Sequence, residues 1–193
     1  MTQKFLSLEL SIFEGCRFPL FVDIIKEIYD SELRQKKSVI YTNKVNLDEY
    51  LIPTYGEFPK FSCWENRNYP NKVFLISSDD KSTLAHVIHK KAGGDYIRVL
   101  MSGNGIQFPA FHFHYSDSCF NDRDILAYKE DKWVFFEKGT PLDIENTNYY
   151  KNRLVKNRLN SDIIEEYLLR LGINMWDVDG CIDNIITYEQ NAW

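Results

Sequence analysis

The stretch YIRVLMSGNGIQFPAFHFHY, residues 96–115, decides the fold class of this chain. Two runs of mainly β-branched and aromatic residues, 96–101 and 106–115, flank the segment Ser-Gly-Asn-Gly. An Asn-Gly pair between two such runs is the strongest short signal for a β-hairpin, because both residues tolerate the positive φ of a tight turn. The stretch therefore predicts two antiparallel strands.

The next segment continues this antiparallel pattern. Residues 125–128 and 133–137 flank a polar Lys-Glu-Asp-Lys turn and predict a second hairpin. Four consecutive strands joined by hairpins form a meander.

One amphipathic helix is well marked near the C-terminal end. Residues 161–171 place apolar side chains on one face, with Asn160 or Ser161 as the N-cap and Gly172 as the stop. The basic segment 149–159 before it has no clean apolar face, and residues 182–188 predict a short final strand.

Strands and helices also alternate before residue 96. The expected elements are a strand over residues 4–13, a helix over 19–30, a strand over 38–45, an ordered loop over 51–70, a strand over 72–77, and a helix over 84–91 that Asp79 or Asp80 caps and Gly93-Gly94 ends. Together these elements predict an α+β fold: a mainly antiparallel sheet, built as a meander of hairpins, with helices packed on one side.

Length and composition favour a single domain over residues 1–193. A chain of this size with 44% hydrophobic residues builds one core, and no linker-like segment divides it. The N-terminus does not resemble a secretory signal, and no apolar run reaches the roughly eighteen residues of a membrane span. Four scattered cysteines without a C-x-x-C pair indicate reduced thiols. We therefore expect a cytoplasmic protein without a cofactor.

The acidic charge is concentrated at the C-terminal end. Residues 161–193 contain seven acids and one base, a net charge of −6, whereas the whole chain carries −5. Phosphate binding needs a basic surface, so this balance argues against direct nucleic-acid binding and favours a basic protein partner.

Acidic and aromatic residues are interleaved in this region. Such a charge run is usually only a solvated face, but exposed aromatic residues ringed by charge are typical of protein interfaces. The predicted partner-binding residues are Glu165, Glu166, Trp176, Asp177, Asp179 and Asp183.

The four histidines form two close pairs, His86 with His89 and His112 with His114. Spacings of i, i+3 on a helix and i, i+2 on a strand put each pair on one face, where imidazoles bind zinc. Asp117 or Cys119 would add a further ligand, or Cys119 would act as a nucleophile.

A structural role for the second histidine pair is the competing interpretation. If Phe111, Phe113 and Tyr115 face the core, His112 and His114 lie on the open face of the sheet. Neither pair completes a known metal motif, so we assign no metal ligand and no catalytic residue.

The order of four motifs resembles bacterial immunity proteins encoded beside polymorphic or contact-dependent toxins. The motifs are TLAHVIHKKAGGDYIRVL, WVFFEKGTPL, YYKNRLVKNRL and SDIIEEYLLRLG, and the resemblance covers roughly residues 72–172, about half of the chain. The resemblance implies a non-enzymatic protein that binds a cognate antibacterial toxin, expected to be a basic nuclease, and occludes its active site. The alternatives are a metal-dependent hydrolase that uses the two histidine pairs and a non-catalytic structural or adaptor domain.

Overall fold

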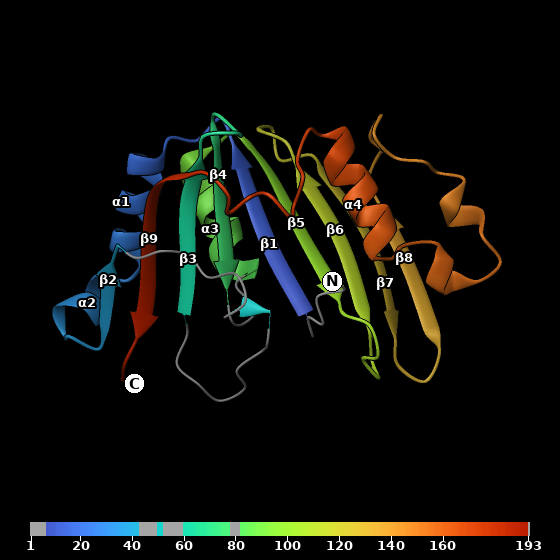
Figure 1. Ribbon diagram of the computed structural model, residues 1–193, viewed down its shortest axis with the longest axis horizontal. Coiled ribbons are helices and arrows are strands. Elements are labelled where there is room, and N and C mark those ends of the chain that lie inside the picture. Colours follow the sequence, from blue (N-terminus) through green and yellow to red (C-terminus); the bar gives the residue numbers. More distant parts are fainter. Residues whose placement is uncertain (1–6, 43–49, 52–59, 78–81, 193) are drawn as a thin grey trace.

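The computed structural model describes residues 7–42, 50–51, 60–77 and 82–192, and their core element is a nine-stranded antiparallel sheet (Figure 1). The strand order is β2-β9-β3-β4-β1-β5-β6-β7-β8. The strands are β1 (Ser7–Glu14), β2 (Ser38–Tyr41), β3 (Lys60–Asn66), β4 (Lys72–Ser77), β5 (Asp95–Ser102), β6 (Ala110–Ser116), β7 (Asp122–Lys129), β8 (Trp133–Lys138) and β9 (Ile182–Gln190). The helices are α1 (Phe18–Ile28), α2 (Asp30–Arg34), α3 (Ser82–Ala92) and α4 (Ser161–Arg170), with 3-10 turns η2 (Tyr149–Lys151) and η3 (Val155–Asn157).

The α+β class and the meander are confirmed. Strands β5 to β8 pair in sequence order, each antiparallel to the next, as the two predicted hairpins require. The Asn160 side chain accepts a hydrogen bond from the Ile163 amide and caps α4, also as predicted. No helix among the described residues is long and apolar enough to cross a membrane.

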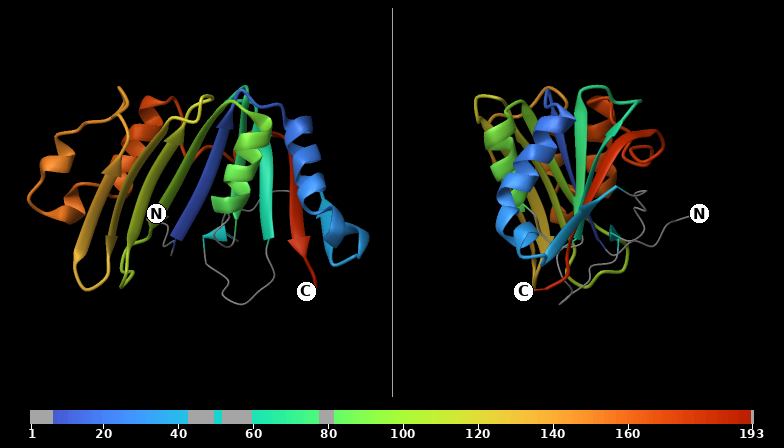
Figure 2. Two further views of the ribbon diagram at one scale, coloured as in Figure 1. Left: turned by 180° about the vertical axis from the view of Figure 1, so that it is seen from behind. Right: turned by 90° about the vertical axis from the view of Figure 1, so that its left-hand side faces the viewer.

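The helices do not lie on one side of the sheet, as the sequence had predicted. Helix α4 packs on one face, and α1 and α3 pack on the opposite face (Figures 1 and 2). Both faces of the central strands are therefore buried. In β1, for example, Leu10 and Ile12 belong to the α4-side core, whereas Phe13 belongs to the α1 and α3 side.

Strand β3 was wrongly expected to be part of a loop over residues 51–70. It lies in the sheet between β4 and β9, and nearly all of its side chains are buried. A strand covered on both faces lacks the polar and apolar alternation that marks a half-buried strand, so periodicity does not find it. The proposed caps Asp79 and Asp80, and residues 43–45 of the second predicted strand, lie outside the described residues.

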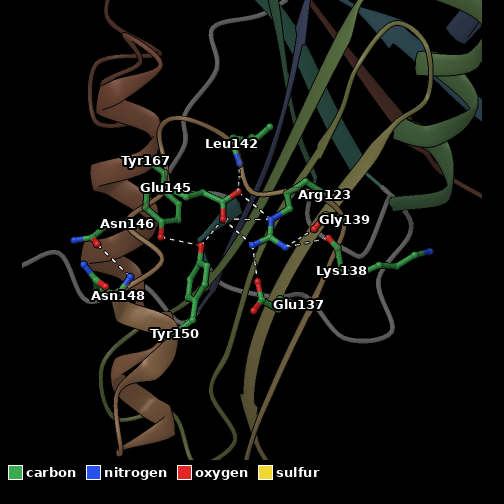
Figure 3. Close-up of polar contacts among 10 residues, drawn as sticks. All are labelled: Arg123, Glu137, Lys138, Gly139, Leu142, Glu145, Asn146, Asn148, Tyr150 and Tyr167. Carbon is green, nitrogen blue, oxygen red and sulfur yellow. Dashed lines mark hydrogen bonds and ion pairs between the residues drawn. The ribbon is translucent and has the colours of Figure 1, made fainter.

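A buried ion pair ties the segment after β8 to the sheet (Figure 3). Arg123 of β7 donates from Nε and Nη2 to Glu145, at 2.9 and 2.7 Å, and its Nη2 also donates to Glu137 at 2.7 Å. Glu145 accepts a further hydrogen bond from the Tyr150 hydroxyl, which lies 2.9 Å from the Tyr167 hydroxyl of α4. The network thus links β7, the segment after β8 and α4, and it fixes the outer surface that α4 presents.

Candidate functional site

The six predicted partner-binding residues come from three consecutive segments. Glu165 and Glu166 lie on α4, Trp176, Asp177 and Asp179 lie on the connection to β9, and Asp183 lies at the start of β9. Figure 1 shows that α4 and this connection cover the same face of the sheet. We call the six residues the acidic surface.

The connection is pinned to the sheet, and this determines which of its side chains face outward. The Val178 carbonyl accepts hydrogen bonds from Trp64 Nε1 and Asn66 Nδ2, both at 2.7 Å. Met175 and Val178 are buried, whereas Trp176 is 44% exposed and Asp179 is also exposed. The buried side chains of Met175 and Val178 therefore fix the connection against the sheet, and the exposed side chains have defined positions.

Half of the acidic surface is already engaged within the chain. Glu166 pairs with Arg170 and accepts a hydrogen bond from the Tyr149 hydroxyl at 2.8 Å, and Asp183 pairs with Arg67 at 2.6 Å. The side-chain amide of Asn68 donates to the Asp177 carboxylate over a longer distance, 3.5 Å. Exposed pairs of this kind contribute little free energy, so a partner can replace them.

Glu165 and Asp179 differ from these three acids. Neither forms an ion pair with any residue that the structure describes. Their negative charges are therefore the least neutralised within the acidic surface, which makes them the clearest targets for charge reversal.

One apolar residue of this face was not predicted. Leu169 is 59% exposed on α4, next to Glu165 and Glu166 in the helical spacing. The helical spacing of the sequence already places Leu169 outside the apolar face of α4, so its exposure could have been predicted. Together with Trp176, it adds exposed apolar area to the acidic surface.

The two histidine pairs meet on the opposite face of the sheet. A cavity of about 320 Å³ lies between α3 and strands β5 and β6, and three of the four histidines line it. We call it the histidine cavity; its lining residues are Thr83, His86, Tyr96, Arg98, His112 and His114. The prediction that Phe111, Phe113 and Tyr115 face the core is confirmed, with Tyr115 only partly buried. The expectation that His112 and His114 lie on an open face is wrong, because α3 covers this part of the sheet and the two side chains are only 19% and 16% exposed.

The fourth histidine is fully buried beside the histidine cavity. The Nε2 atom of His89 lies 3.1 Å from the Gly94 carbonyl, and the ring lies against Tyr96. Burial lowers the pKa of His89, so its neutral form is favoured. His89 thus has a structural role at the end of α3.

A chain of hydrogen bonds fixes the protons behind the cavity. Arg98 donates from Nε to Glu9 at 2.9 Å, and its Nη1 lies 3.1 Å from His112 Nδ1. An arginine only donates, so Nδ1 of His112 accepts and the proton lies on Nε2, which donates to Asp124 at 3.0 Å.

Asp124 completes the chain from the other side. It also accepts a hydrogen bond from His114 Nδ1 at 2.8 Å. The hydrogen bonds from His112 and His114 hold the pKa of Asp124 far below its usual range, so the carboxylate is ionised and cannot donate. The proton of this contact therefore belongs to His114 Nδ1, which leaves Nε2 as the atom of His114 that can bind a proton or ligand.

This proton order bears on the metal hypothesis. The candidate ligand atoms of His112, His114 and Asp124 all lie within 4.8 Å of one another, a spacing that a metal ion could bridge. A metal at His112 Nε2, however, would need a lone pair there, and Arg98 holds the proton on that nitrogen. The arrangement does not fit a metal, and the hydrolase alternative stays a prediction without support from it.

The other residues considered for metal or thiol chemistry lie elsewhere. Asp117 accepts hydrogen bonds from the backbone amides of Cys119 and Asn121, which closes the turn between β6 and β7. Cys119 is exposed in this turn. The carboxylate beside the histidines is Asp124, a residue that the sequence did not single out.

Comparisons with known proteins do not assign this chain to a family. No family model matches it, and no curated protein or solved structure is significantly similar to it.

Proposed function

We propose that this protein is an immunity protein that binds and neutralises a cognate antibacterial toxin in the cytoplasm. The observation that carries the proposal is the acidic surface: two exposed apolar residues, Trp176 and Leu169, belong to the same segments as its carboxylates, and α4 and the connection to β9 cover one face of the sheet. The chain's net negative charge is concentrated in this part of the sequence, where residues 161–193 carry a net charge of −6. The expected partner is therefore a basic protein domain, such as a nuclease.

The physical basis is steering by charge followed by apolar docking. A basic nucleic-acid groove attracts carboxylates over about a Debye length, which raises the association rate. Trp176 and Leu169 would then be desolvated against the partner, and such buried anchors supply most of the affinity of an interface. A protein bound in this way occludes the groove from nucleic acid, so it needs no catalytic chemistry of its own.

The acidic surface also has the rigidity that a preformed interface needs. The hydrogen-bond network of Arg123, Glu145 and Tyr150 reaches α4 through the Tyr167 hydroxyl and holds the helix against the sheet. Trp64 holds the connection by its hydrogen bond to the Val178 carbonyl. A surface that does not reorganise loses less conformational entropy on binding.

Genomic context and direct binding test the proposal. We expect a gene for a large secreted toxin immediately upstream, and its C-terminal domain should bind this protein with one-to-one stoichiometry and lose its nuclease activity. A metabolic operon at this position, or an active toxin domain in the presence of excess protein, would contradict the proposal.

Charge reversal locates the interface. The variant Glu165→Lys with Asp179→Lys should slow association about tenfold at low salt, with a smaller effect at high salt. The control is Glu130→Lys, which changes an exposed acid in the turn between β7 and β8, outside the acidic surface. Trp176→Ala should act mainly by raising the dissociation rate. Equal effects of the control and the double variant would place the interface elsewhere.

A further inference from the structure

We propose that the histidine cavity binds a small oxyanion, a phosphate or carboxylate group, through the imidazoles of His86 and His114. This site lies on the α3 side of the sheet, opposite the acidic surface, and it does not depend on the immunity function. The volume of about 320 Å³ matches a small ligand rather than a macromolecule.

The first argument is the charge of the lining. Among the described residues, the cavity is lined by one guanidinium, three imidazoles and two hydroxyl side chains, without a carboxylate. The neighbouring carboxylates, Glu9 and Asp124, contact Arg98 and the imidazoles but are not lining residues. They orient the positive groups, as the outer partners of a binding site do.

The second argument is the proton order derived above. His112 cannot gain a proton while its Nδ1 accepts from Arg98. His114 can, because protonation at Nε2 leaves its Nδ1 hydrogen bond to Asp124 intact. His114 is therefore poised to become a charged donor when an anion enters, and charge-assisted hydrogen bonds to anions are short and strong.

The third argument is the balance of charge around the site. Among the described residues that form ion pairs with the lining groups, and with neutral imidazoles, Glu9 and Asp124 outweigh Arg98 by one negative charge. Each proton that an imidazole takes up offsets one of these negative charges. Asp122 of β7 is a further acidic neighbour of this histidine group, and the buried His89 does not line the cavity. Anion binding should therefore be coupled to proton uptake and be stronger at pH 6 than at pH 8.

The experiment titrates the full-length protein with inorganic phosphate and, in parallel, with acetate, by calorimetry and by NMR of the imidazole nitrogens. Sulfate, whose charge is constant over this range, measures the pH dependence. We expect one saturable site, and a tighter response to phosphate or to acetate shows which oxyanion the site prefers. The change in calorimetric heat between buffers of different ionisation enthalpy should report proton uptake.

Matched variants separate this site from general attraction of anions. His114→Gln and His86→Gln should each weaken binding about tenfold or more, because each removes a charged donor. Lys132→Gln, which removes an exposed positive charge from the turn between β7 and β8, should leave binding unchanged. Circular dichroism confirms that the variants are folded.

Three results would overturn the proposal. The first is the absence of saturable binding of phosphate, acetate and sulfate at pH 6. The second is an equal loss of binding in Lys132→Gln and the histidine variants. The third is stoichiometric zinc binding that Asp124→Asn abolishes, together with an Nδ1 proton on His112 in the NMR spectrum, which would show that the three groups form a metal site instead.

Discussion

Replacing Glu145 by Gln should destabilise the protein strongly. The Glu145 side chain is fully buried and accepts hydrogen bonds from Arg123, the Leu142 amide and the Tyr150 hydroxyl, at 2.7 to 2.9 Å for the shortest contact with each. A neutral amide would leave Arg123, which is 2% exposed, with only the half-exposed Glu137 as a charged partner. The amide nitrogen would also face donors, because one carboxylate oxygen becomes an N–H group.

The expected loss is about 3–5 kcal/mol of unfolding free energy, the cost of removing one partner from a buried ion pair. The matched control is Glu137→Gln, which removes the second carboxylate from the same guanidinium. Its side chain is 40% exposed and accepts one hydrogen bond at 2.7 Å, so we expect a loss of about 1 kcal/mol or less.

Urea denaturation followed by tryptophan fluorescence measures both variants. The difference should appear as a shift of the midpoint at constant slope, since a changed slope would indicate a changed unfolded state. In addition, Arg123→Met with Glu145→Leu should lose less than the sum of the two single losses, because neither charge is then left unpaired. Equal losses of unfolding free energy in Glu145→Gln and Glu137→Gln would refute the claim that burial of the Arg123–Glu145 ion pair determines its contribution to stability.

Two further predictions concern the α3 side of the sheet. Asp124 has a lowered pKa in the folded state, so its contribution to stability is present above the pKa of an unfolded aspartate, about 3.9, and is lost as the pH falls below it. The difference in unfolding free energy between wild type and Asp124→Asn, measured by urea denaturation, should therefore shrink between pH 5 and pH 3. A constant difference would contradict the assigned ionisation. Gly94→Ala should lower the unfolding free energy by more than about 2 kcal/mol, because Gly94 has a φ of +81° and a Cβ atom there would lie 2.1 Å from the Glu14 carbonyl oxygen. The control is Gly105→Ala, at a position with a similar φ but with no atom of a non-adjacent described residue within 4 Å of the added Cβ. Its thermal unfolding should show only the backbone cost of about 1–2 kcal/mol.

Local signals in the sequence were sufficient for most of the sheet. The Asn-Gly turn, the alternation in β1 and the caps of α4 depend on neighbouring residues, and each identified an element that the structure contains. Strand β3 and the division of the helices between two faces depend on contacts between distant segments. A strand such as β3, paired with β4 and β9, owes its structure to partners that no local pattern reveals.

The histidine cavity shows the same limit at the level of single residues. Both histidine pairs were visible in the sequence, but Asp124 lies outside the strand predicted over residues 125–128. In the structure β7 begins at Asp122, and its register places Asp124 directly opposite His114. The register follows from the turn at 117–121, whose geometry is set by hydrogen bonds to Asp117, so the carboxylate partner could not be assigned before the pairing was known.

The alternation along β6 makes the two proposed sites separable. Phe111 and Phe113 pack toward α4, beneath the side of the sheet that carries the acidic surface, whereas His112 and His114 line the cavity on the α3 side. A partner that covers α4 therefore leaves the cavity open. The buried network around Arg123 lies on the α4 side, so its disruption should weaken the proposed toxin binding more than the proposed oxyanion binding. Because the two proposed sites lie on opposite faces of the sheet, the loss of binding at one site in a variant does not predict a loss at the other, and each proposal is tested by its own experiment.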